Sequence, residues 1–281
     1  MGRKKWRKGK ALLTLILGGL VLWVGLKAGP SLWNAIWGRG EEKERIARIP
    51  DLTIPPPVGI TPPRIAIIID DLGGSLKSAR ALMDLGHPIT FSILPRLPHS
   101  KRIAEEAHLK GYEVLLHLPL EPHEYPEKNP GEGAIFTGMS LLEMKQQFLH
   151  DLESVPYAIG VNNHMGSRLT EDREAMKAIL EEAKRRNLFF IDSLTSGRSV
   201  AFSVAYELGL PALRRQVFLD NVAEKGHIKS QILRLAQEAT DRGAGIGIGH
   251  PYKATIEALK ETLPELERQG IRLVKASELI K

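Results

Sequence analysis

Apolar and polar positions alternate in blocks along most of this chain, and beyond residue 63 these blocks predict alternating strands and helices. Short apolar runs rich in β-branched residues indicate buried strands. They lie at 65–70, 89–94, 113–118, 158–162, 188–192, 215–219, 244–249 and 271–274. Amphipathic stretches that indicate helices lie at 76–85, 99–110, 140–152, 171–186, 198–208, 226–242 and 253–269. This order favours an α/β fold whose parallel sheet is closed, or nearly closed, into a barrel.

A doubly wound open sheet is the alternative architecture. The strand at 65–70 is not followed by a Gly-x-Gly-x-x-Gly motif, which disfavours the dinucleotide-binding version of that fold. The longest interruption of the pattern, 119–139, is rich in Pro, Glu and Gly. It predicts a long loop over the face that the carboxyl ends of the strands form.

The chain before residue 64 has a different composition. Residues 1–10 hold six Lys and Arg and no acid, and an apolar run follows at 11–26. We interpret 1–37 as a basic tail with a signal anchor, held in the inner membrane through 11–27. Residues 38–63 are first charged and then proline-rich, which is typical of a semi-rigid linker. A barrel domain over 64–281 would then lie in the periplasm or outside the cell; secretion after signal cleavage is the alternative.

The net charge of +6 belongs to the tail. Because six of the 39 basic residues lie within 1–10, the remainder carries 33 basic and 33 acidic residues. A neutral body gives no support for nucleic-acid binding. The chain contains no cysteine, so no disulfide framework is expected.

Polar residues stand at the carboxyl ends of the predicted strands. Such ends meet on one face of a parallel barrel, where ligands bind. Asp70 and Asp71 close the first strand, and regular alternation predicts that the two acids point differently, as a base and a metal ligand would. The later strands contribute Arg96, His117, Glu121, Asn163, His164, Arg168, Asp192, Asp220 and His250. Each also has a structural interpretation, as a helix cap, a turn residue or a hydrogen-bonded core histidine.

The types of these residues indicate a metal site. A set of Asp, His and a further His or Glu, without cysteine, suits a catalytic zinc or another borderline divalent ion with one open position.

Four segments resemble the divergent polysaccharide deacetylase family, a branch of the NodB-like carbohydrate esterases. They are Ile-Ile-Ile-Asp-Asp-Leu-Gly, Leu-Leu-His-Leu-Pro-Leu-Glu-Pro, Gly-Val-Asn-Asn-His-Met-Gly-Ser and Ile-Gly-Ile-Gly-His-Pro. The resemblance covers 64–281 and implies a distorted (β/α) barrel of about seven parallel strands with a metal-dependent hydrolase site, often zinc. It implies Asp70 as the base, Asp71 and His117 as ligands, and His250 as the general acid.

The third ligand departs from the wider superfamily. Its His-x-x-x-His motif would place a histidine at position 121, where this chain has Glu121. His164 follows a strand directly and is close to a glycine, so a tight turn could aim its ring into the barrel mouth. We therefore predict Asp71, His117 and His164 as ligands, with Glu121 just behind them.

The predicted function is removal of acetyl groups from a cell-envelope polysaccharide. In this hypothesis Asp192 orients the base or the acid, and Arg96, Glu121, Asn163 and Arg168 hold the substrate. The missing second histidine leaves an alternative from another class, a non-catalytic glycan-binding or scaffold protein on a degenerate barrel. A hydrolase of phosphodiesters is a second alternative, which the lack of a basic phosphate cradle disfavours.

Overall fold

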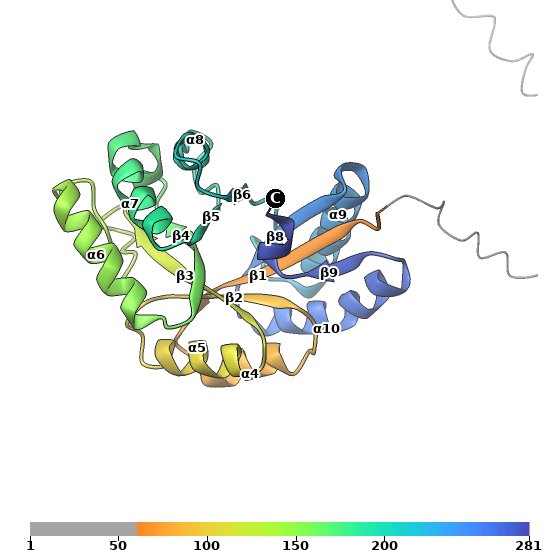
Figure 1. The fold of residues 1–281 in the computed structure, drawn as a ribbon. Helices are drawn as coiled ribbons and strands as arrows, with labels where there is room; N and C mark the ends of the chain where they lie inside the picture. Colours follow the sequence, from red (N-terminus) through yellow and green to blue (C-terminus); the bar gives the residue numbers. More distant parts are fainter. Residues whose placement is uncertain (1–60, 281) are drawn as a thin grey trace, which may run out of the picture. The chain divides into compact units, whose positions relative to one another are not determined.

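The computed structural model describes residues 61–280, and strands and helices alternate through them (Figure 1). The strands are β1 (Arg64–Leu72), β2 (Ile89–Ile93), β3 (Glu113–Leu120), β4 (Ala158–Met165), β5 (Phe189–Asp192), β6 (Ala212–Arg214), β7 (Val217–Phe218), β8 (Ala244–Gly249) and β9 (Arg272–Val274). The helices are α4 (Leu76–Met83), α5 (Ser100–Leu109), α6 (Leu141–Ser154), α7 (Arg173–Arg185), α8 (Ala201–Glu207), α9 (Lys225–Arg242) and α10 (Lys253–Arg268), with short 3₁₀ turns η1 (Leu169–Glu171) and η2 (Ala276–Leu279). Each predicted helix is present, and seven of the eight predicted strands lie where they were expected.

All pairs in the sheet are parallel, in the order β6-β5-β4-β3-β2-β1-β8-β7, and β9 pairs with the start of β1. The helices lie along the outer side of this curved sheet (Figure 1). The predicted α/β barrel of parallel strands is confirmed.

The prediction of a single strand at 215–219 was wrong in detail. The segment 212–218 pairs first with β5, as β6, and then with β8, as β7. Between them the amide of Arg215 donates to Asp192 O at 3.1 Å, and the amide of Gln216 donates to Ile246 O at 3.0 Å. One stretch of chain thus changes partners half-way and links the two edges of the sheet. Counted as one strand, it completes a distorted ring of seven.

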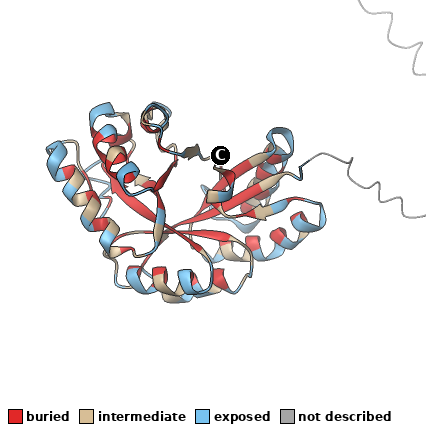
Figure 2. Ribbon diagram, viewed as in Figure 1, coloured by how far each residue is buried: buried red, intermediate tan, exposed pale blue. Residues whose placement is uncertain are grey.

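Successive side chains of a strand point to opposite faces of the sheet, and this alternation, or parity, divides the apolar residues into two separate cores. In β1, Ile65, Ile67 and Ile69 pack in a cluster that includes the inner faces of the helices. Ala66 and Ile68 belong to a smaller cluster made of strand and η2 residues only, which fills the interior of the barrel. Figure 2 shows the same layering, with buried residues along the strands and on one side of each helix. The parity decides which side chains can reach an interior site.

The segment after β9 closes the amino-terminal end of the barrel. Ala276 and Leu279 of η2 join the interior cluster. The η2 amides meet a buried polar pair: Ala276 N donates to Thr90 Oγ1, and Ser277 N donates to Glu113, whose carboxylate also accepts from Thr90. Every polar atom named here has a hydrogen-bond partner, so η2 is held firmly across this end of the barrel. The candidate site residues lie at the opposite end.

The predicted anchor at 11–27 and most of the linker at 38–63 lie outside the described residues. Within 61–280, no helix combines the length and the apolar character that crossing a bilayer requires. The long loop predicted at 119–139 is present between β3 and α6, and it pairs back on β3 through the Leu120–Ile135 bridge.

Candidate metal centre

Asp70 and Asp71 lie at the carboxyl end of β1, where the strand departs from regular geometry. Ile68 belongs to the barrel interior, so Asp70, two positions further on, faces inward as well. Asp71 has a φ of 55°, and the register of β1 against β2 shifts between Ile69 and Leu72. A left-handed φ at a residue other than glycine is costly, and such strain gathers at functional sites.

This irregular turn brings both carboxylates to the same side. Asp70 Oδ2 lies 3.5 Å and Asp71 Oδ1 lies 3.1 Å from Nε2 of His117. The prediction that the two acids point differently was therefore wrong, because it assumed a regular strand through Asp71. Their surroundings still differ: Asp70 is 2% exposed, whereas the Asp71 side chain is 31% exposed and faces the mouth of the barrel.

Three potential ligand atoms converge at this point. Asp71 Oδ1 lies 2.8 Å from His164 Nδ1 and 3.1 Å from His117 Nε2, and the two ring nitrogens are 3.2 Å apart. His117 comes from β3 and His164 from the end of β4, just before Met165, whose φ is 49°. The structure thus brings together the three residues that were predicted as metal ligands.

Asn162 sets the orientation of His117. The Asn162 side-chain amide donates to Asp70 Oδ1 at 2.8 Å, so its oxygen is the acceptor that faces His117 Nδ1 at 3.0 Å. Ser92 donates to the same oxygen. The proton of the neutral ring then lies on Nδ1, which leaves a lone pair on Nε2 toward Asp71. A side chain that fixes the tautomer of a ligand in this way is the usual support of a metal-bound histidine.

The donor set fits a divalent metal. Asp71 Oδ1 is buried and has no hydrogen-bond partner among the described residues. A bond length of about 2.0–2.1 Å in a tetrahedral zinc site puts ligand atoms roughly 3.3 Å apart, close to the separations seen here. A buried oxygen without a donor, facing two imidazole nitrogens, is a site that a cation would complete.

Charge and burial shift the pKa values of this cluster. Burial alone raises the pKa of Asp71, but the close approach of the His117 and His164 rings and the positive charge that they carry when protonated hold it well below its usual range. Burial raises the pKa of Asp70 despite the opposing charges of His117 and His250. One carboxylate is therefore kept ionised while its neighbour holds a proton more readily.

A histidine–aspartate pair lies on the other side of Asp71. His250 follows β8, and its Nδ1 lies 2.8 Å from Asp220 Oδ1, while its Nε2 lies 3.8 Å from Asp71 Oδ2. The other oxygen of Asp220 accepts from the His250 amide at 2.6 Å and from Thr255 Oγ1 at 2.7 Å. Burial lowers the pKa of His250, but the hydrogen bond and charge of Asp220, with Asp70 and Asp71, raise it to about 9.

Asp220 takes the place that was predicted for Asp192. The Asp192 carboxylate accepts from the Leu194 amide at 2.9 Å and from Ser199 Oγ at 2.8 Å, so it shapes the turn after β5. It is fully buried and makes no hydrogen bond to the acid or to the base. The prediction of a catalytic role for Asp192 is corrected, because it lies on the outward parity of β5, where Phe190 joins the helix-side core.

Asn163 also lies on the outward face of its strand, where Val161 joins the helix-side core, so the predicted substrate contact of Asn163 is corrected. Its oxygen accepts from the Ser193 amide at 2.9 Å, its nitrogen donates to Met165 O at 2.8 Å, and the residue is 1% exposed. Asn163 therefore joins the loops after β4 and β5 and has no free face for substrate. The asparagine that contacts the centre is Asn162, which pairs with His117 across β3 and β4. The sequence alone gives no signal for this choice, because relating side chains on β4 to His117 on β3 requires the register between the two strands.

Arg96 and Glu121 also have partners elsewhere. Arg96 Nε donates to Asp151 of α6 at 3.0 Å. The Glu121 carboxylate accepts from the Thr137 amide at 2.6 Å and from Arg168 at 3.0 Å, and Glu121 is not among the three converging residues. These contacts give both residues structural roles, and the substrate contacts predicted for Arg96 and Glu121 stay predictions. Arg168 stays on the rim, with its side chain 52% exposed.

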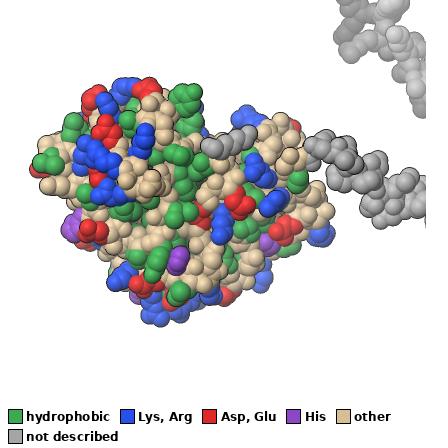
Figure 3. Space-filling view, in the orientation of Figure 1, with side chains coloured by type: hydrophobic (Ala, Val, Ile, Leu, Met, Phe, Trp, Pro, Cys, Tyr) green, Lys and Arg blue, Asp and Glu red, His purple; other side chains and the backbone are tan. Residues whose placement is uncertain are grey.

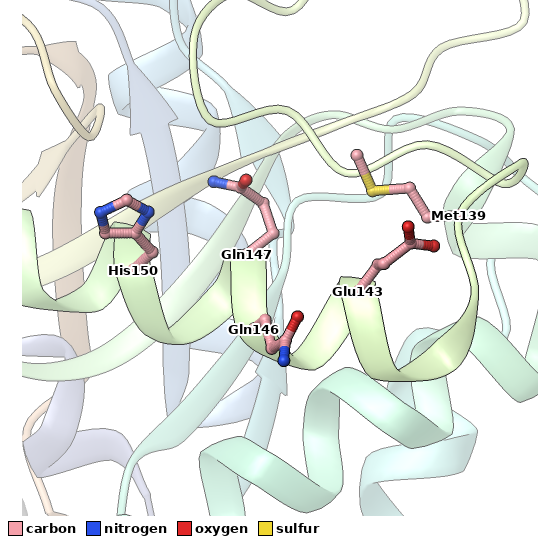
Figure 4. Close-up of a pocket in the computed structure, with 5 residues that line it drawn as sticks. All are labelled: Met139, Glu143, Gln146, Gln147 and His150. Carbon is pink, nitrogen blue, oxygen red and sulfur yellow. The ribbon is translucent and has the colours of Figure 1, made fainter.

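Hollows elsewhere on the surface share no residue with this centre. Figure 4 shows a pocket of about 280 Å³ along α6, lined by Met139, Glu143, Gln146, Gln147 and His150. It offers a single carboxylate and a single imidazole, and Glu143 is already engaged in the cap of α6. On the face seen in Figure 3, basic and acidic side chains are interspersed. The concentrated chemistry of the described residues is at the barrel mouth.

Comparison with known proteins agrees with this geometry. Residues 67–280 match the family described as divergent polysaccharide deacetylase. The chain is 36% identical over 218 residues to the uncharacterized protein YibQ of Escherichia coli (strain K12), covering 77% of this chain and 67% of that protein. It is 34% identical over 216 residues to an uncharacterized protein of Haemophilus influenzae, covering 77% of this chain and 76% of that one. The crystal structure of the uncharacterized protein ATU2773 from Agrobacterium tumefaciens C58 shares 26% identity with a TM-score of 0.75, covering 79% of this chain and 90% of that one.

Proposed function

This chain belongs to the divergent polysaccharide deacetylase family, and from that premise we propose that it is a metal-dependent hydrolase that removes acetyl groups from a cell-envelope polysaccharide. The observation that carries the proposal is the convergence of Asp71, His117 and His164, with the buried carboxylate of Asp70 on one side and the His250–Asp220 pair on the other. A base, a metal site and an acid in one cluster are the parts that acyl hydrolysis needs.

Asp71, His117 and His164 would hold the metal, and zinc is the ion we expect from two imidazoles and one carboxylate. When bound there, such an ion supplies polarisation of the acyl oxygen and lowers the pKa of the attacking water. Asn162 keeps Nε2 of His117 free for this role. His164 would take the place of the histidine that the sequence lacks at position 121, which supports an active site over a degenerate, non-catalytic barrel.

Asp70 would act as the base. Asn162 occupies its Oδ1, so Oδ2 is the oxygen that faces the ligand cluster, 3.5 Å from His117 Nε2. Burial raises the pKa of Asp70, and a carboxylate with raised proton affinity is a better acceptor for the proton of water. The water oxygen adds to the acyl carbon as its proton passes to Asp70 Oδ2.

His250 would act as the acid. Asp220 holds its Nδ1, so the proton to be delivered lies on Nε2, which faces Asp71. With a pKa of about 9, the ring is protonated at neutral pH. The bond between the acyl carbon and the sugar nitrogen or oxygen then breaks as that atom takes the proton from Nε2. Acetate and a free amine or hydroxyl are the products.

We also propose where the reaction takes place. The basic tail and the apolar run at 11–26 support an inner-membrane anchor, which would put the barrel in the periplasm or outside, next to envelope glycans. Arg168, whose side chain is 52% exposed at the rim, is a predicted substrate-binding residue that is in a position to contact a glycan.

Acetate release from acetylated glycans by the full-length, zinc-loaded chain tests the proposal. Peptidoglycan, chitin oligomers and acetylated xylan cover amide and ester linkages, and the matched control is Asp71→Asn. We expect release from at least one of these glycans by the wild type and none by the variant. Equal release by both, or none from any glycan by metal-loaded protein, contradicts the proposal.

A further inference from the structure

An exposed tyrosine stands directly beside the proposed acid. Tyr252 is 47% exposed, and the centre of its ring lies 5.5 Å from that of His250. It occupies the N-cap of α10, and its amide donates to His250 O at 2.8 Å across Pro251. Proline and the helix start hold the backbone here, so the ring is carried on a rigid support.

Tyr252 is the most exposed of four neighbouring groups at this side of the mouth, and its ring is tilted by 31° to that of His250. The Arg215 guanidinium lies 3.7 Å from the centre of the Phe218 ring, and the Phe218 ring stacks near His250 at 6.4 Å between centres. Tyr252, which is 47% exposed, is more open to solvent than the His250 side chain, which is 25% exposed. Partial burial and the charges of Asp220 and Asp71 raise the pKa of its phenol, which agrees with a position at the edge of the site.

The fold itself does not require this ring to be aromatic. The Tyr252 hydroxyl makes no hydrogen bond within residues 61–280, in contrast to Tyr112, whose hydroxyl donates to Met83 O beneath the helices. A half-exposed aromatic ring whose hydroxyl is not used by the fold, beside a cluster of polar groups, is suited to contact a ligand.

The β4 side of the mouth is polar instead. Arg168 is paired with Glu121, and beyond it Glu171 accepts from Arg198 at 3.1 Å and contacts His123 at 3.1 Å. The strand order separates β4 from β8 by three strands, so these groups and Tyr252 belong to different walls. The aromatic ring of Tyr252 lies on one wall, and hydrogen-bonding groups lie on the other. This arrangement suits a pyranose ring, which has an apolar C–H face and polar hydroxyl edges.

We propose that Tyr252 is the platform on which a pyranose ring of the substrate stacks, next to the acetyl group that is cleaved. The inference rests on the proposed function for its substrate class. Stacking on Tyr252 would set the leaving atom beside His250 Nε2, and the hydroxyl edge of the sugar would face the β4 wall. Tyr252 is thus a specificity-determining residue, which selects sugar-linked acetyl groups over simple acetate esters.

The test compares Tyr252→Ala and Tyr252→Phe with a matched control, Tyr206→Ala on α8, where the tyrosine is 79% exposed and far along the chain from the site. On acetylated chitin oligomers we expect Tyr252→Ala to raise KM about tenfold with a smaller change in kcat, as the loss of one aromatic contact would. Its kcat/KM on 4-nitrophenyl acetate, which has no sugar ring, should fall at least fivefold less. Tyr252→Phe and Tyr206→Ala should stay within about twofold of wild type.

Equal losses of Tyr252→Ala on both substrates would overturn the inference, because they would mean that the ring only supports His250. An unchanged KM on the oligomer, or an equal effect of Tyr206→Ala, would also overturn it. If the wild type hydrolyses neither substrate, the proposed function fails, and titration of chitin oligomers followed by NMR decides the platform separately. Loss of oligomer binding in Tyr252→Ala alone supports it, and binding equal to wild type contradicts it.

Discussion

Both ends of this barrel carry buried polar side chains that face its interior. At one end all of them have hydrogen-bond partners, and at the other they do not. At the amino end, Glu113 accepts from Thr90 Oγ1 and from the amide of Ser277, so a carboxylate is fully used to hold η2 in place. At the carboxyl end, Asp71 Oδ1 faces two imidazole nitrogens and has no donor among the described residues. A satisfied cluster stabilises a fold, whereas converging lone pairs are a cost that only a ligand repays.

Of the changes considered, His164→Ala should have the largest effect on metal binding at the carboxyl end of the barrel. It removes one of three ligand atoms, so the affinity for zinc should fall by roughly 10³-fold or more. Glu121→Gln is the control, because Glu121 contacts Thr137 and Arg168 and no member of the cluster. Calorimetric titration measures both variants. Near-normal binding by His164→Ala together with lost binding by Glu121→Gln would reverse the assignment of the third ligand.

Asp70→Asn should separate the base from the ligands. We expect zinc affinity to stay within about tenfold of wild type while kcat falls roughly 10²–10⁴-fold, the usual contribution of a positioned base. Asp71→Asn should lose both metal and turnover. Metal content after dialysis and acetate release are the two readouts, and identical behaviour of the two variants would refute this division of roles.

Glu113→Ala should lower the stability of the fold at the amino end of the barrel and leave zinc affinity unchanged. It leaves the Thr90 hydroxyl and the Ser277 amide unpaired in a buried place, which should lower the free energy of unfolding by about 2–3 kcal/mol. The exposed Glu153→Ala is the matched control, expected within about 0.5 kcal/mol of wild type. Denaturant unfolding, followed by zinc titration of the folded variant, checks both parts; a weakened zinc site would show that the two ends are coupled.

Two adjacent asparagines sharpen the comparison further. Asn162→Ala removes the group that orients His117 and should weaken zinc binding roughly 10–100-fold. Asn163→Ala should lower stability instead, because Asn163 joins the loops after β4 and β5, and should leave zinc affinity near that of wild type. Equal zinc affinities in the two variants would contradict the parity on which the site was built.

Asp151 of α6, a buried carboxylate away from both ends of the barrel, should make stability depend on pH. Burial raises the pKa of Asp151 to about 7, although Arg96 and Gln147 oppose the shift. The folded state therefore holds a proton that the unfolded chain has released, so stability should fall as pH rises from about 4 to 7, with a slope of at most about 1.4 kcal/mol per pH unit. Asp151→Asn should flatten that part of the profile in denaturant titrations. An unchanged slope would show that Asp151 stays ionised beside Arg96.

The fold was largely predictable because its signals are local. Runs such as 65–70 and 244–249 are apolar throughout, as strands buried on both faces must be, and the helices between them have one apolar side. The exception was 212–218. Its first half pairs with β5 and its second with β8, and a change of partner at Arg215 and Gln216 leaves no periodic mark in the sequence.

The sequence by itself determined which residue types gather at the mouth, since strand ends in a parallel barrel share one face, and it pointed to Asp71, His117 and His164 together. Only the tertiary structure decided how neighbours divide their roles. Asn162 rather than Asn163, and Asp220 rather than Asp192, reach the centre because of side-chain parity within each strand. Asp71 reaches it through a left-handed turn that breaks that parity. Such choices depend on the register between strands distant in sequence, which no local pattern records.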